Sequence, residues 1–230
     1  MTTLLIDVDT QFDFCDPQGA LFVAGADRLD AAFGALTKRA IGADALILGS
    51  VDSHAFDAWE FAGALDAGPN GERPGFPAHC VKGTRGWLKL PSTLAPRARF
   101  VPNVALDDAA LEAALTRHAP QQLLLEKEVY SLFANPNAEA VLARLAGAGA
   151  GAEPTRFVVF GVATDYCVRA AALGLVEWLG RRGVSGAVGE VWLVEDAIAA
   201  VDAGGGARAL AECTAAGVRR VTVAAALAAL

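Results

Sequence analysis

Six short apolar runs, separated by helical patterns, constrain the fold of this chain more than any other feature of its sequence. The runs cover residues 4–8, 45–51, 123–125, 157–162, 191–194 and 218–223. Each is short enough for a strand and apolar on both faces, as buried parallel strands are. Apolar residues recur at helical spacing over residues 26–40, 138–146, 166–182 and 207–216. This alternation predicts an α/β fold with a mostly parallel sheet.

Length and composition favour one water-soluble domain. The 230 residues include no linker that would divide the chain, so we expect a single domain over residues 1–230. Residues 66–77 form a Gly/Pro loop, and residues 146–154 resemble a flexible connection between a helix and a strand. The apolar fraction is 54%, but much of it is alanine, and no apolar run approaches the ~20 residues that a bilayer span requires.

Charge and cysteine usage exclude several partners and compartments. The net charge of −7 and the absence of a basic block argue against a nucleic-acid partner. We see no signal sequence, which predicts a cytoplasmic protein that does not bind membranes. The four cysteines are widely spaced and contain no Cys-x-x-Cys, so we expect free thiols.

Polar side chains follow four of the apolar runs. Asp9 follows the first run, Asp52 and His54 follow the second, and Lys127 follows Glu126 after the third. The fourth run leads into the sequence "ATDYC", which ends at Cys167. Ligands of open α/β sheets bind beyond the carboxyl ends of the strands, so these side chains should meet at one edge of the sheet.

Cys167 occupies the start of a predicted helix, directly after a predicted strand. Backbone N–H groups and the helix dipole at such a position lower the pKa of a thiol and can stabilise an oxyanion beside it. Thr164 and Asp165 are plausible caps for this helix. The alternative is a small buried side chain without chemistry, because free cysteine is often buried. The position favours a nucleophile.

Asp9 and Lys127 are candidate partners of this thiol. An aspartate at a strand end can accept the proton of a thiol and later return it to a leaving group. A nearby ammonium would keep that aspartate ionised and favour the thiolate. A surface position is the alternative for Lys127. For Asp13, four residues after Asp9, a solvated or capping carboxylate is the preferred interpretation.

A mixed set of nitrogen and oxygen ligands surrounds the second strand end. It consists of Asp52, His54, Glu60 and His79, and it suits Zn²⁺, Mn²⁺ or Fe²⁺. In the alternative interpretation Asp52 caps a turn and the two histidines make ordinary hydrogen bonds. His118 is interpreted as a histidine at a helix end and is not included.

Five blocks of sequence together resemble the isochorismatase-like cysteine hydrolases, with nicotinamidases as the most similar branch. The blocks are "LLIDVDTQFDFCDPQGAL", "DSHAFDAWEF", "FPAHCVKGTRG", "EKEVYSLF" and "GVATDYCVRAAA", in the order of the family. The resemblance implies a three-layer α/β/α fold, an Asp9–Lys127–Cys167 triad and one divalent metal ion, foremost Zn²⁺. It also implies a cis peptide between Val162 and Ala163, an oxyanion hole formed by the N–H groups of Ala163 and Cys167, and a homo-oligomer.

The resemblance further implies hydrolysis of a small primary carboxamide, foremost nicotinamide, through a thioester on Cys167. Glu60 stands where many nicotinamidases have a third histidine among the metal ligands. Phe76 and Tyr166 replace a tryptophan and a histidine that are common in that branch, and these two residues are expected to line the substrate pocket with Phe14 and Tyr130. The alternatives are a related amidase for another amide or carbamoyl compound, an isochorismatase, and a non-catalytic metal-binding domain. A vinyl-ether hydrolysis needs no thiol nucleophile, and an intact triad argues against a non-catalytic domain.

Overall fold

The chain folds around a parallel sheet, as the alternating pattern predicts. The structure is a computed structural model that describes residues 1–65, 67–68, 75–146, 154–181 and 189–230. Within these ranges, seven strands pair in the order β3-β4-β2-β1-β5-β6-β7, and every pairing is parallel. The strands are β1 (Thr2–Val8), β2 (Ile47–Asp52), β3 (Ala98–Val101), β4 (Gln122–Lys127), β5 (Thr155–Val162), β6 (Gly189–Ala199) and β7 (Arg219–Val221).

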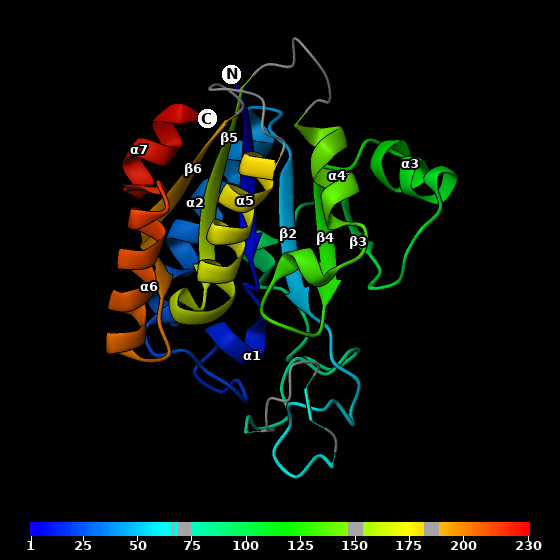
Figure 1. Cartoon of the computed structure of the whole chain (residues 1–230), viewed down its shortest axis with the longest axis vertical. Coiled ribbons are helices and arrows are strands. Elements are labelled where there is room, and N and C mark those ends of the chain that lie inside the picture. Colours follow the sequence, from blue (N-terminus) through cyan, green and yellow to red (C-terminus); the bar gives the residue numbers. More distant parts are fainter. Residues whose placement is uncertain (66, 69–74, 147–153, 182–188) are drawn as a thin grey trace.

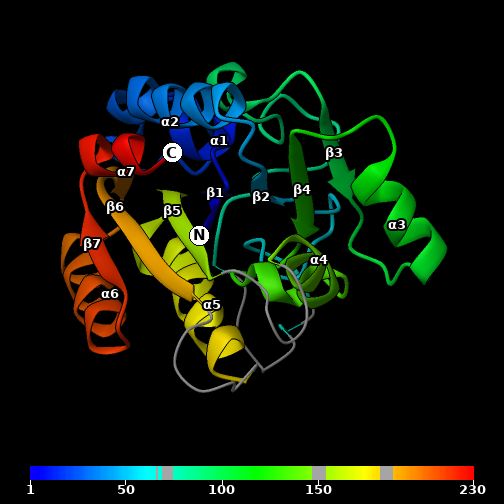
Figure 2. The same cartoon turned by 90° about the horizontal axis from the view of Figure 1, so that it is seen from above.

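Helices cover both faces of the sheet and complete three layers, which confirms the expected α/β/α architecture (Figure 2). One face carries α1 (Phe12–Cys15), α2 (Asp30–Gly42) and α7 (Val223–Ala229). The other carries α4 (Ala138–Leu145), α5 (Arg169–Arg181) and α6 (Ala203–Ala215). Helix α3 (Asp108–Thr116) lies beside the edge strand β3. Short helical turns occupy Ala26–Leu29, Pro91–Thr93, Leu132–Ala134 and Thr164–Val168.

Two hydrophobic cores lie on opposite faces of the sheet, because successive side chains of a strand point in opposite directions. Leu4, Ile6 and Val8 of β1 join the core that includes Leu175 and Trp178 of α5. Leu5, between them, joins the core that includes Phe33 and Leu36 of α2. The central strands are therefore apolar on both faces, which explains why their sequences are continuous apolar runs.

The structure corrects several predicted elements. Strand β3 and helices α3 and α7 were not predicted, and the run at 218–223 ends as a strand at Val221. Thr222 then caps α7 by accepting a hydrogen bond from the N–H of Ala225, so Val223 is helical. Strand β3 is short and lies at the edge of the sheet, where Arg99 is half-buried and Phe100 is exposed, so it produces no apolar run. Most of the expected connection at 146–154, much of the loop at 66–77, and Arg182 lie outside the described residues.

The carboxyl ends of the central strands form the lower edge of the sheet in Figure 1, opposite to both termini. Strands β1 and β5 converge there so closely that Gly161, at φ +123°, has no room for a side chain. A Cβ atom at this position would lie 2.0 Å from the carbonyl oxygen of Val8. Among the described residues, none of the helices has the length and apolarity needed to cross a membrane.

Candidate active site

Asp9 lies one residue beyond β1, at the centre of the carboxyl edge. Its backbone adopts φ +48°, which turns the chain out of the sheet and leaves the side chain fully buried. Its Oδ1 accepts a hydrogen bond of 2.7 Å from the hydroxyl of Ser50, and its Oδ2 lies 2.8 Å from the Nζ atom of Lys127. The strand-end rule therefore places this carboxylate correctly.

Lys127 ends β4 and is fully buried, so the surface alternative for this lysine is wrong. Its Nζ atom contacts the carboxylates of Asp9 and Asp52 and lies 3.6 Å from the Sγ atom of Cys167. Burial alone would lower the pKa of this ammonium, but the two carboxylates outweigh it and raise the pKa well above its ordinary value. Lys127 is thus a permanent positive charge inside the site.

Cys167 lies on the helical turn Thr164–Val168, directly after β5, and is 5% exposed. Its sulfur lies within 4.8 Å of a carboxylate oxygen of Asp9 and of Asp52. Burial raises the pKa of the thiol well above its ordinary value, and Lys127 offsets this only in part. The expectation of a lowered pKa is therefore wrong, because the cost of burying a thiolate, together with the nearby carboxylates of Asp9 and Asp52, exceeds the attraction of Lys127.

The expected caps near Cys167 are also corrected by the structure. No side chain caps the turn that carries Cys167, and the residue at its N-cap position is Ala163. The carboxylate of Asp165 instead accepts hydrogen bonds from the backbone N–H groups of Val201 and Asp202, before α6. The expected cis peptide between Val162 and Ala163 is present.

A protonated thiol requires a base, and Asp9 is placed to act as one. Burial raises the pKa of the Asp9 carboxyl, while Lys127 and the Ser50 hydroxyl oppose this by stabilising the ionised form. A raised pKa makes the carboxylate a stronger base, closer to the optimum for proton transfer near neutral pH. The site thus combines a buried thiol, a basic carboxylate and a fixed cation.

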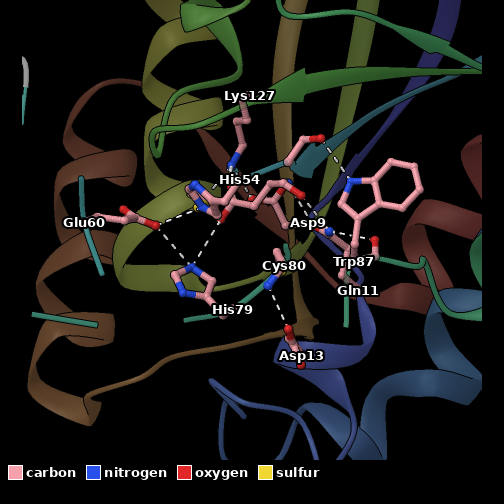
Figure 3. Close-up of polar contacts among 12 residues, drawn as sticks. Asp9, Gln11, Asp13, His54, Glu60, His79, Cys80, Trp87 and Lys127 are labelled. Atoms are coloured by element: carbon pink, nitrogen blue, oxygen red, sulfur yellow. Dashed lines mark hydrogen bonds and ion pairs between the residues drawn. The ribbon is translucent and has the colours of Figure 1, made fainter. Parts of the chain in front are cut away.

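Donor atoms of Asp52, His54 and His79 converge beside this triad, within 4.8 Å of one another. The Nε2 atoms of His54 and His79 lie 3.9 Å and 4.0 Å from Oδ2 of Asp52. Glu60 joins the group from the loop after β2, with its Oε1 atom 2.8 Å from His54 Nε2 and 3.2 Å from His79 Nε2 (Figure 3). Asp52, His54 and His79 therefore converge as the sequence predicted, and Glu60 contacts the two histidines.

The chemistry of this donor set fits a divalent cation. The Nδ1 atom of His79 lies 2.8 Å from the carbonyl oxygen of Pro77, which leaves Nε2 as the ligand atom, a common arrangement in metal sites. Burial lowers the pKa of His54, but the nearby carboxylates of Asp52 and Glu60 outweigh it and raise the pKa to about 9. Two buried carboxylates therefore attract positive charge to this point, which a metal ion would supply.

A pocket opens onto both groups. The four aromatic residues expected from the sequence, Phe14, Phe76, Tyr130 and Tyr166, line it. The ring centroids of Tyr130 and Tyr166 lie 5.2 Å apart, and those of Phe76 and Tyr166 lie 6.1 Å apart. The remaining lining residues are Leu21, Val23, Asp52, Glu60, His79, Ala163, Cys167 and Val201. The pocket is thus a mostly apolar space between the sulfur and the metal ligands, suited to a flat ring.

Further polar residues, which the sequence did not single out, fix the backbone around the site. The side chain of Gln11 bonds to the backbone of Asp52, and the indole N–H of Trp87 donates to the hydroxyl of Ser53 (Figure 3). Asp13 caps backbone N–H groups, as preferred from the sequence. Its carboxylate accepts from Ala20 at 3.0 Å and from Cys80, the neighbour of His79, at 2.7 Å. His118 is exposed beyond the end of α3, outside the site.

Comparison with known proteins agrees with this fold. The chain is similar to the pyrazinamidase of Pyrococcus horikoshii in complex with zinc, with 25% identity, a TM-score of 0.68, and 96% and 99% of the two chains covered. It is also similar to PnC1 from L. infantum in complex with nicotinate, with 22% identity, a TM-score of 0.68, and coverage of 97% and 94%. For the nicotinamidase of Bacillus subtilis the values are 21%, 0.66, and 96% and 99%.

Curated protein sequences gave no match. The sequence profile of the isochorismatase domain, however, matches residues 3–225, nearly the whole chain and every residue of the site. The chain therefore belongs to the isochorismatase family of hydrolases.

Proposed function

We propose that this protein is a metal-containing cysteine amidohydrolase that converts nicotinamide and water to nicotinate and ammonia. The observation that carries the proposal is the position of Cys167, which lies between a base with its lysine on one side and an aromatic pocket beside a metal-ligand cluster on the other. A pyridine ring with a carboxamide fits such a pocket, because the ring can reach the ligand cluster while the carbonyl carbon faces the sulfur. The similar structures with zinc and with nicotinate support this choice.

The first half of the reaction forms a thioester. Asp9 accepts the proton of the Cys167 thiol, and the sulfur attacks the carbonyl carbon of the amide. Backbone N–H groups of Ala163 and Cys167 stabilise the oxyanion of the tetrahedral intermediate. The protonated Asp9 then donates its proton to the amine nitrogen, so that ammonia leaves and the acyl group stays on sulfur.

The second half regenerates the enzyme. Asp9, again ionised, takes a proton from a water molecule that attacks the thioester carbonyl. When the C–S bond breaks, this proton passes to the sulfur, and the free acid leaves. Lys127, 2.8 Å from the carboxylate of Asp9, favours the ionised form of Asp9 before each proton transfer, while burial keeps that carboxylate basic.

The ligand cluster would hold one divalent ion, for which we propose Zn²⁺. Asp52, His54 and His79 would bind it together with Glu60. When bound, the ion would supply a Lewis acid for the ring nitrogen of the substrate. The carboxylate of Glu60, in place of a neutral histidine, adds a negative charge to the cluster and would reduce that acidity.

The aromatic residues would orient the substrate ring. Phe14 and Phe76 flank His79, with ring centroids 5.4 Å and 6.0 Å from its imidazole. They would therefore contact the part of the substrate that faces the ligand cluster. Tyr130 and Tyr166 line the same pocket from the segments that carry Lys127 and Cys167.

Ammonia release from a panel of amides tests the proposal. We expect rapid hydrolysis of nicotinamide and pyrazinamide, both with a ring nitrogen, and slow hydrolysis of benzamide, which has the same shape without it. The Cys167→Ala variant serves as the inactive control. A related amidase would instead prefer a carbamoyl compound, and equal rates with benzamide and nicotinamide would contradict a role for the ligand cluster. Activity on isochorismate alone would contradict the proposal.

A further inference from the structure

Strand β1 leaves the sheet before its neighbour β2 ends. The register between them stops at the pair Val8 and Ser50, and the N–H of Asp9 still donates to the carbonyl of Ser50 at 3.2 Å. Asp9 then turns away at φ +48°, whereas β2 continues to Asp52. Residues two apart in a strand direct their backbone polar groups to the same side. The N–H and C=O of Asp52 therefore face the space that β1 has vacated.

The side chain of Gln11 fills this space. Its Oε1 atom accepts a hydrogen bond of 2.8 Å from the N–H of Asp52, and its Nε2 atom donates one of 2.8 Å to the C=O of the same residue. The second hydrogen of Nε2 bonds to the carbonyl of Trp87, also at 2.8 Å. Gln11 is fully buried, so its amide forms these bonds in place of hydrogen bonds with solvent. The side-chain amide of Gln11 thus forms the two hydrogen bonds to the backbone of Asp52 that a further residue of β1 would form if the strand continued.

Asp52, which Gln11 holds in this way, lies between the two parts of the site. One carboxylate oxygen of Asp52 contacts Lys127, and the other faces His54 and His79. A carboxylate can serve both sides only if its backbone stays fixed. Asp52 ends β2 and pairs with a neighbouring strand on one side only, at Lys127 of β4, and strand ends are prone to fraying. The bonds from Gln11 remove that freedom.

We propose that Gln11 is a positioning residue that fixes Asp52, so that one carboxylate serves both the lysine of the triad and the metal ion. The inference rests on the proposed function, since it assigns a role to a residue behind a proposed metal ligand. Hydrogen-bond partners of metal ligands typically change metal affinity ~10- to 100-fold when they are removed. We expect a loss of this size for Zn²⁺ in the Gln11→Met variant, which keeps the volume and removes all three bonds.

A second buried glutamine provides the matched control. The side chain of Gln122 also bonds to backbone, with Nε2 donating to the carbonyl of Thr93 at 2.9 Å and Oε1 accepting from the N–H of Ala95 at 2.9 Å. It is fully buried as well, but it lies at the start of β4, at the opposite end of that strand from Lys127. Gln122→Met should therefore lower thermal stability as Gln11→Met does and leave zinc affinity unchanged.

The test measures zinc affinity by competition with a chromophoric chelator, for the full-length wild type and both variants, with the melting temperature of each. The visible spectrum of the cobalt-loaded proteins is the second readout, because a displaced ligand changes the d–d bands and a purely structural role would not. We expect weaker zinc binding and altered bands for Gln11→Met only. If that variant does not fold, Gln11→Glu, which keeps the acceptor for the N–H of Asp52, takes its place.

The possible outcomes distinguish a failure of the role proposed for Gln11 from a failure of the proposed metal site. A wild type that binds no zinc contradicts the metal site itself, and the inference with it. A wild type that binds zinc, together with a folded Gln11 variant of equal affinity, contradicts the inference alone. Equal losses of zinc affinity in the Gln11 and Gln122 variants would also overturn it, because the effect would then reflect general destabilisation.

Discussion

Replacing Lys127 by methionine removes the only cation within 3 Å of Asp9 among the described residues, at nearly constant volume. Asp9 and Asp52 would then be two buried carboxylates that share one site, with their oxygens within 4.8 Å. Both burial and the second carboxylate raise the pKa of Asp9, and Lys127 is the main group that lowers it. Asp9 must be ionised to accept the proton of Cys167. The Lys127→Met variant should therefore lose activity at the acidic end of its pH–rate profile, where Asp9 becomes protonated.

The size of the shift follows from the geometry. Two unit charges 2.8 Å apart attract each other by roughly 6 kcal/mol at an effective dielectric constant of about 20. This is an upper bound, because the chain relaxes and water enters the space of the lost ammonium. Carboxyls beside a cation show pKa values lower by ~1–3 units. We expect the acid limb of kcat/KM to move upward by ~1–3 pH units, which reduces the rate below that limb ~10- to 1000-fold.

The assay is the pH dependence of kcat/KM for nicotinamide, and Lys89→Met is the matched control. The Nζ atom of Lys89 lies 2.9 Å from Asp7, with both side chains buried, so this pair resembles that of Lys127 in distance and burial. Removing one partner of a buried pair costs about 3–5 kcal/mol of stability, so both variants should melt earlier. Only Lys127→Met should move the acid limb. Lys127→Arg keeps the charge but is broader and planar, and should restore activity only in part.

An acid limb at the same pH in Lys127→Met and in wild type would refute this reasoning. Lys127 would then support the fold without controlling the base, and Asp9 would have to be kept ionised by other groups. A limb that moves equally in Lys89→Met would point to a general loosening of the site. Either result would remove the electrostatic argument for the triad.

Four further predictions concern the site and its surroundings. Cys167→Ala should abolish release of ammonia with an unchanged circular dichroism spectrum, and residual turnover would show that another group is the nucleophile. Zinc must displace the proton that His54 holds with a pKa of about 9, so zinc affinity should rise ~tenfold per pH unit toward that value. In metal-free protein the raised pKa of His54 also stabilises the fold. This stabilisation is complete below pH ~6.5 and is lost as the pH rises through about 9, so the melting temperature should fall between these two pH values. Gly161→Ala should destabilise the fold strongly, since its Cβ would overlap the carbonyl of Val8, and an unchanged melting temperature would contradict the close approach of β1 and β5.

The meeting of Asp9, Asp52 and Lys127 could be predicted because each lies close behind an apolar run. Asp9, Asp52 and Lys127 end their strands or follow them by one residue, and parallel strands bring such positions to a common edge. The pairing of Gln11 with Asp52 could not be predicted in this way. It depends on β1 ending earlier than β2, and the register of two strands far apart in sequence is set by tertiary packing.

The protonation state of Cys167 was mispredicted for a related reason. Sequence shows that the residue begins a helical segment, but it does not show how deeply the sulfur is buried. In the structure the desolvation of a thiolate exceeds the attraction of Lys127. Strand β3 escaped prediction because Arg99 and Phe100, at the sheet edge, are half-buried or exposed and leave no apolar signature.

The carboxylate of Asp52 affects how mutagenesis of this site must be interpreted. Because Asp52 contacts Lys127 as well as facing the two histidines, replacing it disturbs the triad and the ligand cluster together. An inactive Asp52 variant would therefore not show that the reaction depends on metal. His79 faces the cluster without a described contact to Lys127, Asp9 or Cys167. Dependence on metal should be measured with His79 variants, and an Asp52 variant measures the coupling between the two halves of the site.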